Sequence, residues 1–456
     1  AMSPIVILIL SGLALGGSFW LFRMSCGSMS FSRINIISFS FYVPLLLQGY
    51  FGAIAVALDV DGHPVLSMLI DDKERALGWA AIMYSMVVVP LGMLAANRLL
   101  LRQSPLYAWT RYTHAPMRLS SGSHEGRLLM SLFILSACCI VAVGYSFWAS
   151  GGIGMLTIAG ADSVSAAEVR EAVGWDFAGV AWIRQLFAIT LCPLMSYIAF
   201  AYWKTTGTQE CRAWFILMLV ASLVSLSMTF AKSSVFMYLF GYIFLAVILE
   251  GRVSPGRGSL VALLALAVLL GMYAFSYSDQ SIKETFSLRN HNSGIVTRVI
   301  VGQIIGVYGS LYLFPAYWDH LSFLRQMGWY AAMTGENQEQ SCDLIMATIM
   351  NPQGARGFAT SLFPAEAWAV YGWPGLIAGP LLVGCAIGLM AIVFLRSPKN
   401  PVTVGVFAYL SCKISLGSGF LLFFYNPEVV KALAVLACFV WVGYSPRRQM
   451  PPRPVR

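Results

Sequence analysis

Apolar runs of about twenty residues recur along the chain, and this pattern constrains the fold more than any other feature. A helix of about 20 residues is long enough to cross the hydrocarbon core of a bilayer, which is about 30 Å thick. The chain is 58% hydrophobic and only 11% charged, which is unlike a soluble domain. Backbone groups inside lipid must be hydrogen-bonded within the protein, and the short alternating segments of a β-barrel are missing. The sequence therefore predicts an all-α integral membrane protein.

We predict about eleven membrane-spanning helices from these runs. The expected spans are 4–22, 34–57, 77–96, 128–148, 180–203, 213–231, 234–250, 259–277, 367–395, 401–424 and 427–445. The chain then divides into residues 1–277 with eight spans and short loops, 278–366 as a large loop with interfacial or re-entrant helices, 367–445 with the last three spans, and 446–456 as a basic tail.

Lysine and arginine gather in alternate loops, and this fixes the expected orientation. The loop after the third span carries Arg98, Arg102, Arg111, Arg118 and Arg127, and further basic residues lie in 23–33, 204–212, 251–258, 396–400 and the tail. Because cytoplasmic loops carry an excess of Lys and Arg, we place these loops and the C-terminus in the cytoplasm. The N-terminus and the large loop then lie outside. The net charge of +9 follows from this topology, so it does not indicate nucleic-acid binding.

Residues 295–314 are apolar enough to suggest a twelfth span. A crossing there would move Arg396, Lys399 and the basic tail outside, against the distribution of positive charge. We therefore expect this segment to lie at the interface or to dip into the membrane from outside, with Arg298 turned away from lipid.

Several kinds of site are not indicated by the sequence. Cys342 is the one cysteine of the large loop, so we expect no structural disulfide. The five histidines are scattered without metal-ligand spacing, and neither a Walker loop nor a dinucleotide-binding fingerprint is present. We expect neither a metal nor a cofactor.

The charged residues of the large loop are the main functional candidates, because charge near lipid is costly and usually kept for function. The candidates in and beside this loop are Arg289, His291, Arg298, Arg356 and Glu366. Arg184, Lys232 and Lys413 lie in or beside apolar runs. Arg184 and Lys232 either snorkel to the outer headgroups or point inward to bind an anion. Lys413 is too deep to snorkel, so a polar partner within the helix bundle is expected.

Three segments give the chain a resemblance to a known family: TFAKSSVFMYLFGYI around Lys232, RNHNSGIVTRVIVGQIIGVYGSLYLF around Arg298, and ATSLFPAEAWAVYGWPGLIAGPLLVG around Glu366. They resemble segments of the O-antigen polymerase type of bacterial oligosaccharide repeat-unit polymerases. The first resembles the small-residue and basic pair that opens a membrane helix in that family, and the second resembles its Arg-bearing periplasmic helix. The third is similar to its run of proline, acidic, aromatic and glycine residues that enters a late span. Glu366, Tyr371 and Gly372 fall at matching positions. The resemblance in the order of spans and loops covers most of the chain. Lys232 stands where many members of the family carry arginine.

The resemblance implies a glycosyltransferase of the bacterial inner membrane that joins undecaprenyl-pyrophosphate-linked repeat units on the periplasmic face, with no metal or nucleotide. Cations stabilise the leaving pyrophosphate, and arginine suits phosphate best. Arg289, Arg298 and Arg356 are the first candidates for this role, and Lys232 and Arg184 are the second.

A base must accept the proton of the attacking sugar hydroxyl, and Glu366 and His291 are the candidates. Glu366 is equally well explained as a helix N-terminal charge that favours the macrodipole, and His291 as a polar loop residue. Tyr308 and Tyr371 are expected to contact the glycan, although aromatic residues also belong to the ordinary interfacial belt.

Two alternatives use the same pattern of residues. The first is an O-antigen ligase, which passes glycan to lipid A core. The second is a polysaccharide or lipid transporter, against which the sequence shows no internal repeat. A polymerase would have lipid-linked glycan as donor and acceptor, the bilayer as surroundings, and a polysaccharide chain-length regulator as a candidate partner.

Overall fold

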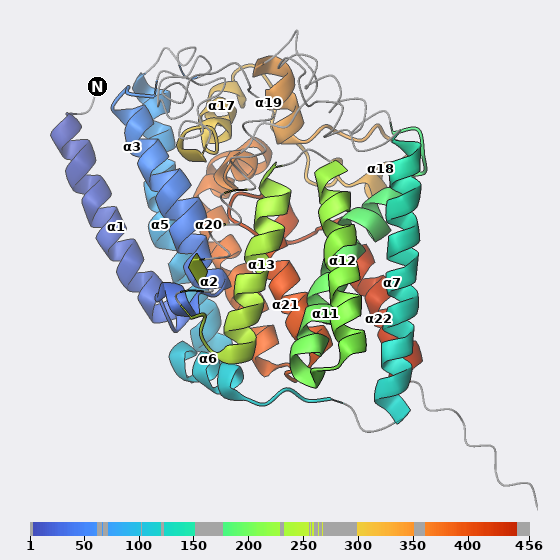
Figure 1. The fold of residues 1–456 in the computed structure, drawn as a ribbon. Helices are drawn as coiled ribbons and strands as arrows, with labels where there is room; N and C mark the ends of the chain where they lie inside the picture. Colours follow the sequence, from blue (N-terminus) through green and yellow to red (C-terminus); the bar gives the residue numbers. More distant parts are fainter. Residues whose placement is uncertain are drawn as a thin grey trace, which may run out of the picture.

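The structure is a computed structural model whose described part is helical throughout. It describes residues 3–61, 66, 72–101, 103–119, 123–150, 177–228, 232–254, 256, 258–259, 263, 267, 299–350 and 361–444. Long helices run roughly side by side, and short helices cover their two ends (Figure 1).

The first half of the fold carries the elements α1 (Pro4–Cys26), η1 (Phe31–Arg33), α2 (Ile36–Ser40), η2 (Phe41–Tyr50), α3 (Phe51–Ala57), α5 (Asp72–Ala96), η3 (Asn97–Leu101), α6 (Pro105–His114), α7 (Ser123–Ala149), α10 (Ala181–Ile183), η4 (Arg184–Leu191), α11 (Cys192–Thr206), α12 (Gln209–Met228) and α13 (Lys232–Glu250). The second half carries α17 (Ile305–Leu313), α18 (Gly328–Thr334), α19 (Cys342–Met350), α20 (Pro364–Arg396), α21 (Pro401–Lys413), η5 (Leu421–Phe423) and α22 (Pro427–Tyr444).

Within the described residues, nine helices are long and apolar enough to cross a membrane. The prediction of an all-α membrane protein is confirmed at this level. The predicted number of about eleven spans is not confirmed. Most of the expected span 259–277 falls outside the described residues, and the helix in 401–424 ends at Lys413.

The loops that were predicted to be cytoplasmic pack against one another at one end of the bundle, called here the basic end. The Val253 amide donates to the Ser32 carbonyl over 2.9 Å, and the Arg118 amide donates to the Lys399 carbonyl over 2.8 Å. α6 covers this end, and α17 and α19 lie at the opposite end, called here the loop end (Figure 1). Loops that the charge pattern assigns to the same side of the membrane thus lie at the same end of the bundle. Which end faces the cytoplasm stays a prediction.

In the described part of the suggested twelfth span, residues 299–300 are helical, residues 301–304 form turns, and α17 is a nine-residue helix. At 1.5 Å per residue it is about 14 Å long, which is too short to cross a bilayer. It is buried at the loop end, where the ring of Tyr308 lies against Gly78 of α5.

The helices α5 and α20 pack closely against each other. A Cβ at Gly92 would overlap the Leu381 carbonyl oxygen, and one at Gly384 would overlap the Val89 carbonyl oxygen. Small residues at these points let the two backbones approach closely, as is usual between membrane helices. This contact fixes α20, the helix that carries Glu366.

Candidate functional site

The helix α20 reverses direction at Gly372. This residue has φ 57° and ψ −136°, a conformation that only glycine adopts readily. A Cβ at Gly375 would overlap the Ala367 carbonyl oxygen, and one at Gly379 would lie 3.3 Å from Ala367 Cβ. Residues 367 and 375 would be about 12 Å apart in a straight helix, so residues 364–371 fold back beside the following turns. We call residues 364–371 the folded-back segment.

The loop end holds the folded-back segment in place. The Leu321 amide donates to the Ala369 carbonyl over 2.8 Å, and His320 Nδ1 lies 3.2 Å from the same oxygen. The indole N–H of Trp368 donates to the Phe314 carbonyl over 2.9 Å. The position of this segment therefore depends on the loop that precedes it by about fifty residues in sequence.

A second interruption lies between α21 and α22, where residues 414–426 form no α-helix. We call these residues the unwound segment. It meets the start of the folded-back segment, since the amide of Phe363, the residue before that segment, donates to the Leu416 carbonyl over 3.2 Å. Non-helical backbone at membrane depth is tolerated where it is buried in protein or lines a cavity, so this meeting of two interruptions is a candidate site.

Glu366 lies where the two segments meet and is only 8% exposed. Its Oε2 accepts a hydrogen bond from the Leu421 amide over 2.9 Å, and the Phe420 amide also hydrogen-bonds the carboxyl group. A Cβ at Gly419 would lie 2.5 Å from the same oxygen. Glu366 also lies in the first turn of α20, so the macrodipole explanation holds as well. The backbone bond orients the carboxylate, and an oriented, poorly solvated carboxylate is suited to accept a proton.

Asp343 is a second carboxyl group at this site, and the sequence analysis did not single it out. It lies in the first turn of α19, and the Ser361 hydroxyl donates to its Oδ1 over 3.0 Å. Burial raises the pKa of Asp343 to about 6, and the two carboxyl groups interact electrostatically. The signal in the sequence is the apolar run that follows Asp343, which indicates a buried helix with an acidic first turn. We call Asp343, Ser361, Glu366, Gly419 and Leu421 the Glu366 site.

The two predicted tyrosines have different surroundings. Tyr371 is 44% exposed and lies edge-on to Phe420, with the ring centroids 6.1 Å apart, so it offers a surface beside the Glu366 site. Tyr308 is fully buried against Gly78. The ring of Tyr308 is thus enclosed by the protein in this arrangement, and its contact with a glycan stays a prediction.

The predicted cations are only partly placed by the structure. The guanidinium of Arg184 lies 4.1 Å from the centroid of the Phe177 ring, and its neighbour Gln185 donates to Glu428. Lys232 is the first residue of α13. The remaining predicted site residues, Arg289, His291, Arg298 and Arg356, lie outside the described residues.

Lys413 ends α21, and its ammonium nitrogen lies 5.9 Å from the Tyr409 ring centroid. It interacts electrostatically with Glu428 at the start of α22. The polar surroundings expected for this lysine are thus provided by the protein. In the part of the chain that the structure describes, neither Lys413 nor Arg184 contacts Glu366.

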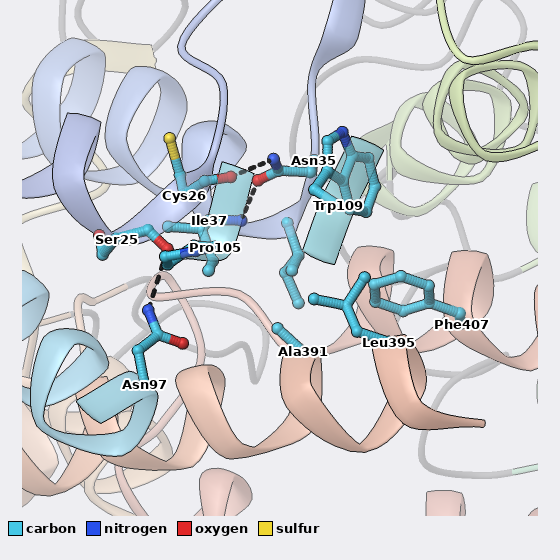
Figure 2. Close-up of a pocket in the computed structure, with 11 residues that line it drawn as sticks. Ser25, Cys26, Asn35, Ile37, Asn97, Pro105, Trp109, Ala391, Leu395 and Phe407 are labelled. Carbon is cyan, nitrogen blue, oxygen red and sulfur yellow. Dashed lines mark hydrogen bonds between the residues drawn. The ribbon is translucent and has the colours of Figure 1, made fainter. Parts of the chain in front are cut away.

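Figure 2 shows a small cavity whose lining includes Asn35, Asn97 and Pro105 and does not include Glu366. The side-chain amide of Asn35 donates to the Cys26 carbonyl over 2.9 Å, and the side-chain amide of Asn97 donates to the Ser25 carbonyl over 3.1 Å. The cavity volume of about 20 Å³ has room for about one water molecule. It is too small for a sugar, so we assign it to packing.

Within the described residues, no group of three His, Cys, Asp or Glu side chains is arranged to hold a metal ion. No family model, no curated protein and no solved structure matches the chain.

Proposed function

We propose that this protein is a membrane glycosyltransferase that polymerises undecaprenyl-pyrophosphate-linked oligosaccharide repeat units, like the O-antigen polymerases that its sequence resembles. The observation that carries the proposal is Glu366, a buried carboxyl group held by a backbone amide where two interrupted helices meet. This site lies at the end opposite the basic loops, which is the periplasmic end in the topology that the charges predict.

In the proposed reaction, a hydroxyl oxygen of the acceptor sugar attacks the anomeric carbon of the donor glycan. The new C–O bond forms as the bond from that carbon to the pyrophosphate oxygen breaks. Glu366 accepts the proton of the attacking hydroxyl, and the bond electrons leave with the lipid pyrophosphate. Tyr371, half exposed beside Glu366, contacts the glycan.

The leaving pyrophosphate gains negative charge, which nearby cations stabilise. Arg289, Arg298 and Arg356 from the long loop are proposed for this role, with Lys232 and Arg184 as further cations. His291 remains the second candidate for the base. The proposed enzyme uses neither a metal nor a nucleotide, and it resides in the bacterial inner membrane with its N-terminus in the periplasm and its C-terminus in the cytoplasm.

The direct test uses the purified protein and one undecaprenyl-pyrophosphate-linked repeat unit, without nucleotide sugar, ATP or added metal. Products are resolved by size. A ladder of lengthening glycans supports a polymerase, and we expect Arg298→Ala and Glu366→Gln to abolish it while the protein still inserts into the membrane. Unchanged substrate, with folded protein and matched repeat chemistry, contradicts the proposal. Transfer that occurs only after lipid A core is added would identify a ligase instead.

A transporter is the second candidate, and the structure provides one observation in its favour. Both α20 and the α21–α22 pair are interrupted within the bundle, and discontinuous helices often form the substrate sites of transporters. A transporter moves its substrate without changing covalent bonds. Translocation of a fluorescent lipid-linked glycan across vesicles, with its mass unchanged, would favour this candidate over the polymerase.

A further inference from the structure

The reversal of α20 at Gly372 places three exposed side chains around one point. Tyr371 and Trp373 flank Gly372 in the chain, and they are 44% and 55% exposed. The third is His320, from the segment between α17 and α18, and a Cβ on Gly372 would lie 3.1 Å from its Nε2. Because Gly372 has no side chain, the imidazole ring can lie directly against the reversal. We call His320, Tyr371 and Trp373 the reversal site.

The imidazole ring of His320 is held in a fixed orientation. Its Nδ1 lies 3.2 Å from the Ala369 carbonyl oxygen, which can only accept, so this nitrogen carries the hydrogen of the bond. The ring is nearly parallel to that of Phe314, with the centroids 6.4 Å apart, and nearly perpendicular to that of Trp368, with the centroids 5.9 Å apart. These contacts use one nitrogen of the ring and direct the other, Nε2, towards Gly372.

The two aromatic rings of the reversal site each pack against a neighbouring ring. The Trp373 ring is perpendicular to the Trp368 ring, with the centroids 5.3 Å apart. The Tyr371 ring lies edge-on to Phe420, whose backbone amide hydrogen-bonds the carboxyl group of Glu366. The reversal site therefore adjoins the Glu366 site, and its rings are supported by the protein while about half of each side chain stays exposed.

We propose that the reversal site binds one sugar ring of the glycan next to the Glu366 site. A sugar ring carries hydroxyl groups around its edge and C–H bonds on its faces. The rings of Tyr371 and Trp373 contact a C–H face, and His320 Nε2 forms a hydrogen bond with a hydroxyl group, which can either donate or accept. Binding sites for small molecules commonly combine aromatic surface with a few polar groups in fixed positions.

The sugar site has a direct consequence for the proposed reaction. Holding reactants in the right geometry supplies a large part of a rate enhancement, so a sugar bound beside Glu366 positions the reacting groups. His320 and Trp373 are then substrate-binding residues in addition to Tyr371. Naming the sugar as part of a lipid-linked substrate rests on the proposed function, whereas sugar binding itself can be measured without turnover.

The test measures the binding of two probes to the full-length protein in detergent. The first probe is the methyl glycoside of the repeat unit used in the polymerisation assay, which has no leaving pyrophosphate and cannot act as a donor. The second is undecaprenyl pyrophosphate without glycan. Dissociation constants are measured by microscale thermophoresis. In Trp373→Leu we expect the glycoside to bind about tenfold more weakly, because the aromatic face is lost. Binding of undecaprenyl pyrophosphate should not change.

The variant His320→Asn separates sugar binding from the structural role of the histidine. The side-chain amide of asparagine can keep the hydrogen bond to the Ala369 carbonyl but places no group at the position of Nε2. We expect the glycoside to bind about fivefold more weakly, with a melting temperature close to that of the wild type. Trp373→Phe keeps an aromatic ring and should retain most of the binding.

Trp441→Leu in α22 is the matched control, because Trp441 is also an exposed tryptophan and is 71% exposed. It should leave glycoside binding unchanged. Exposed tryptophan and tyrosine are also common where lipid headgroups meet water, and residues that serve only as such anchors make no contribution to glycoside binding.

The inference is overturned if the wild-type protein does not bind the glycoside, or if Trp373→Leu and His320→Asn bind it as the wild type does. Equal weakening of both probes also overturns it, because that result indicates a general change in structure. Selective loss of glycoside binding, with no polymer formed by the wild-type protein, upholds the sugar site and contradicts the proposed function. Polymer formation with unchanged glycoside binding in the variants does the reverse, so the two proposals fail separately.

Discussion

At the basic end, the buried ammonium group of Lys399 donates to the carbonyl oxygens of Thr113 and Ala115 over 2.7 Å and 2.9 Å. At the loop end, the buried carboxyl group of Glu366 accepts hydrogen bonds from the backbone amides of Leu421 and Phe420. Both groups are less than one tenth exposed. Lys399 joins two loops of the basic end, whereas Glu366 joins two interrupted helices.

The difference in what the two groups join indicates a difference in role. A buried charge with good partners holds a structure together, and its removal leaves those partners unsatisfied. A buried carboxylate is costly to the fold, and such costs persist at functional sites. We infer that Lys399 is present for stability and that Glu366 is present for chemistry. The predictions below separate these two roles.

The largest expected effect is on activity in Glu366→Gln. Glutamine can still accept the Leu421 hydrogen bond but cannot take a proton, so the rate of polymer formation should fall by about a hundredfold or more. Stability should be unchanged or slightly higher, because no charge is buried. The initial rate per folded molecule measures this effect. A variant that keeps most of the activity would make Glu366 as structural as Lys399.

The next effect comes from Gly419→Ala. The added methyl group would lie 2.5 Å from Glu366 Oε2 and would push the carboxylate away from the Leu421 amide. A misplacement of about 1 Å at a reacting group lowers a rate by about a hundredfold, and smaller shifts cost less. We expect activity to fall about tenfold or more.

Gly144→Ala in α7 is the matched control, since a Cβ there meets no atom within 4 Å. It should leave activity and the melting temperature near the wild-type values. Equal losses in the two variants would show that the glycines of this fold act through general helix packing rather than through the position of Glu366.

The basic end was more predictable from sequence than the loop end. Arg98, Arg111 and Arg118 mark their loops by charge alone, and charge sorting does not depend on tertiary contacts. Glu366 was identifiable because it is an acidic residue at the edge of an apolar run.

The apolar run after Asp343 indicates a buried helix, but the importance of Asp343 was not identifiable, because it depends on Ser361, eighteen residues away in the chain, and on how α17 and α19 pack. The interruptions of the helices at Gly372 and at residues 414–426 could not be predicted from the sequence either. The unwound segment is as apolar as the helix before it, and glycine is common in membrane helices, so Gly417 and Gly419 do not mark a helix end. Gly372 is one of several glycines in its run, and only its backbone conformation and its position against His320 distinguish it in the structure.

A smaller effect, on stability alone, is expected for Lys399→Met. The side chain is 4% exposed, and its loss leaves the carbonyls of Thr113 and Ala115 without this donor. Each such unsatisfied group costs about 1–3 kcal/mol, so the variant should melt several degrees lower. Activity per folded molecule should not change.

Lys431→Met in α22 is the control, because Lys431 is exposed. Thermal unfolding followed by size-exclusion chromatography compares the two variants. If Lys399→Met lowered activity at temperatures well below its melting point, the separation between a stabilising end and a chemical end would fail.

The smallest expected effect is a difference in how the two ends respond to pH. Burial raises the pKa of Asp343 from 3.8 to about 6, so its contribution to stability is fully present below pH 3.8 and is lost as pH rises through 6. Burial lowers the pKa of Lys399 from 10.5 to about 8, so its contribution is present above pH 10.5 and is lost as pH falls through 8. The melting temperature of the wild-type protein should therefore fall relative to Asp343→Asn between pH 4 and pH 7. Relative to Lys399→Met it should rise between pH 8 and pH 10. Parallel slopes in the two comparisons would show that the ends do not differ in this way.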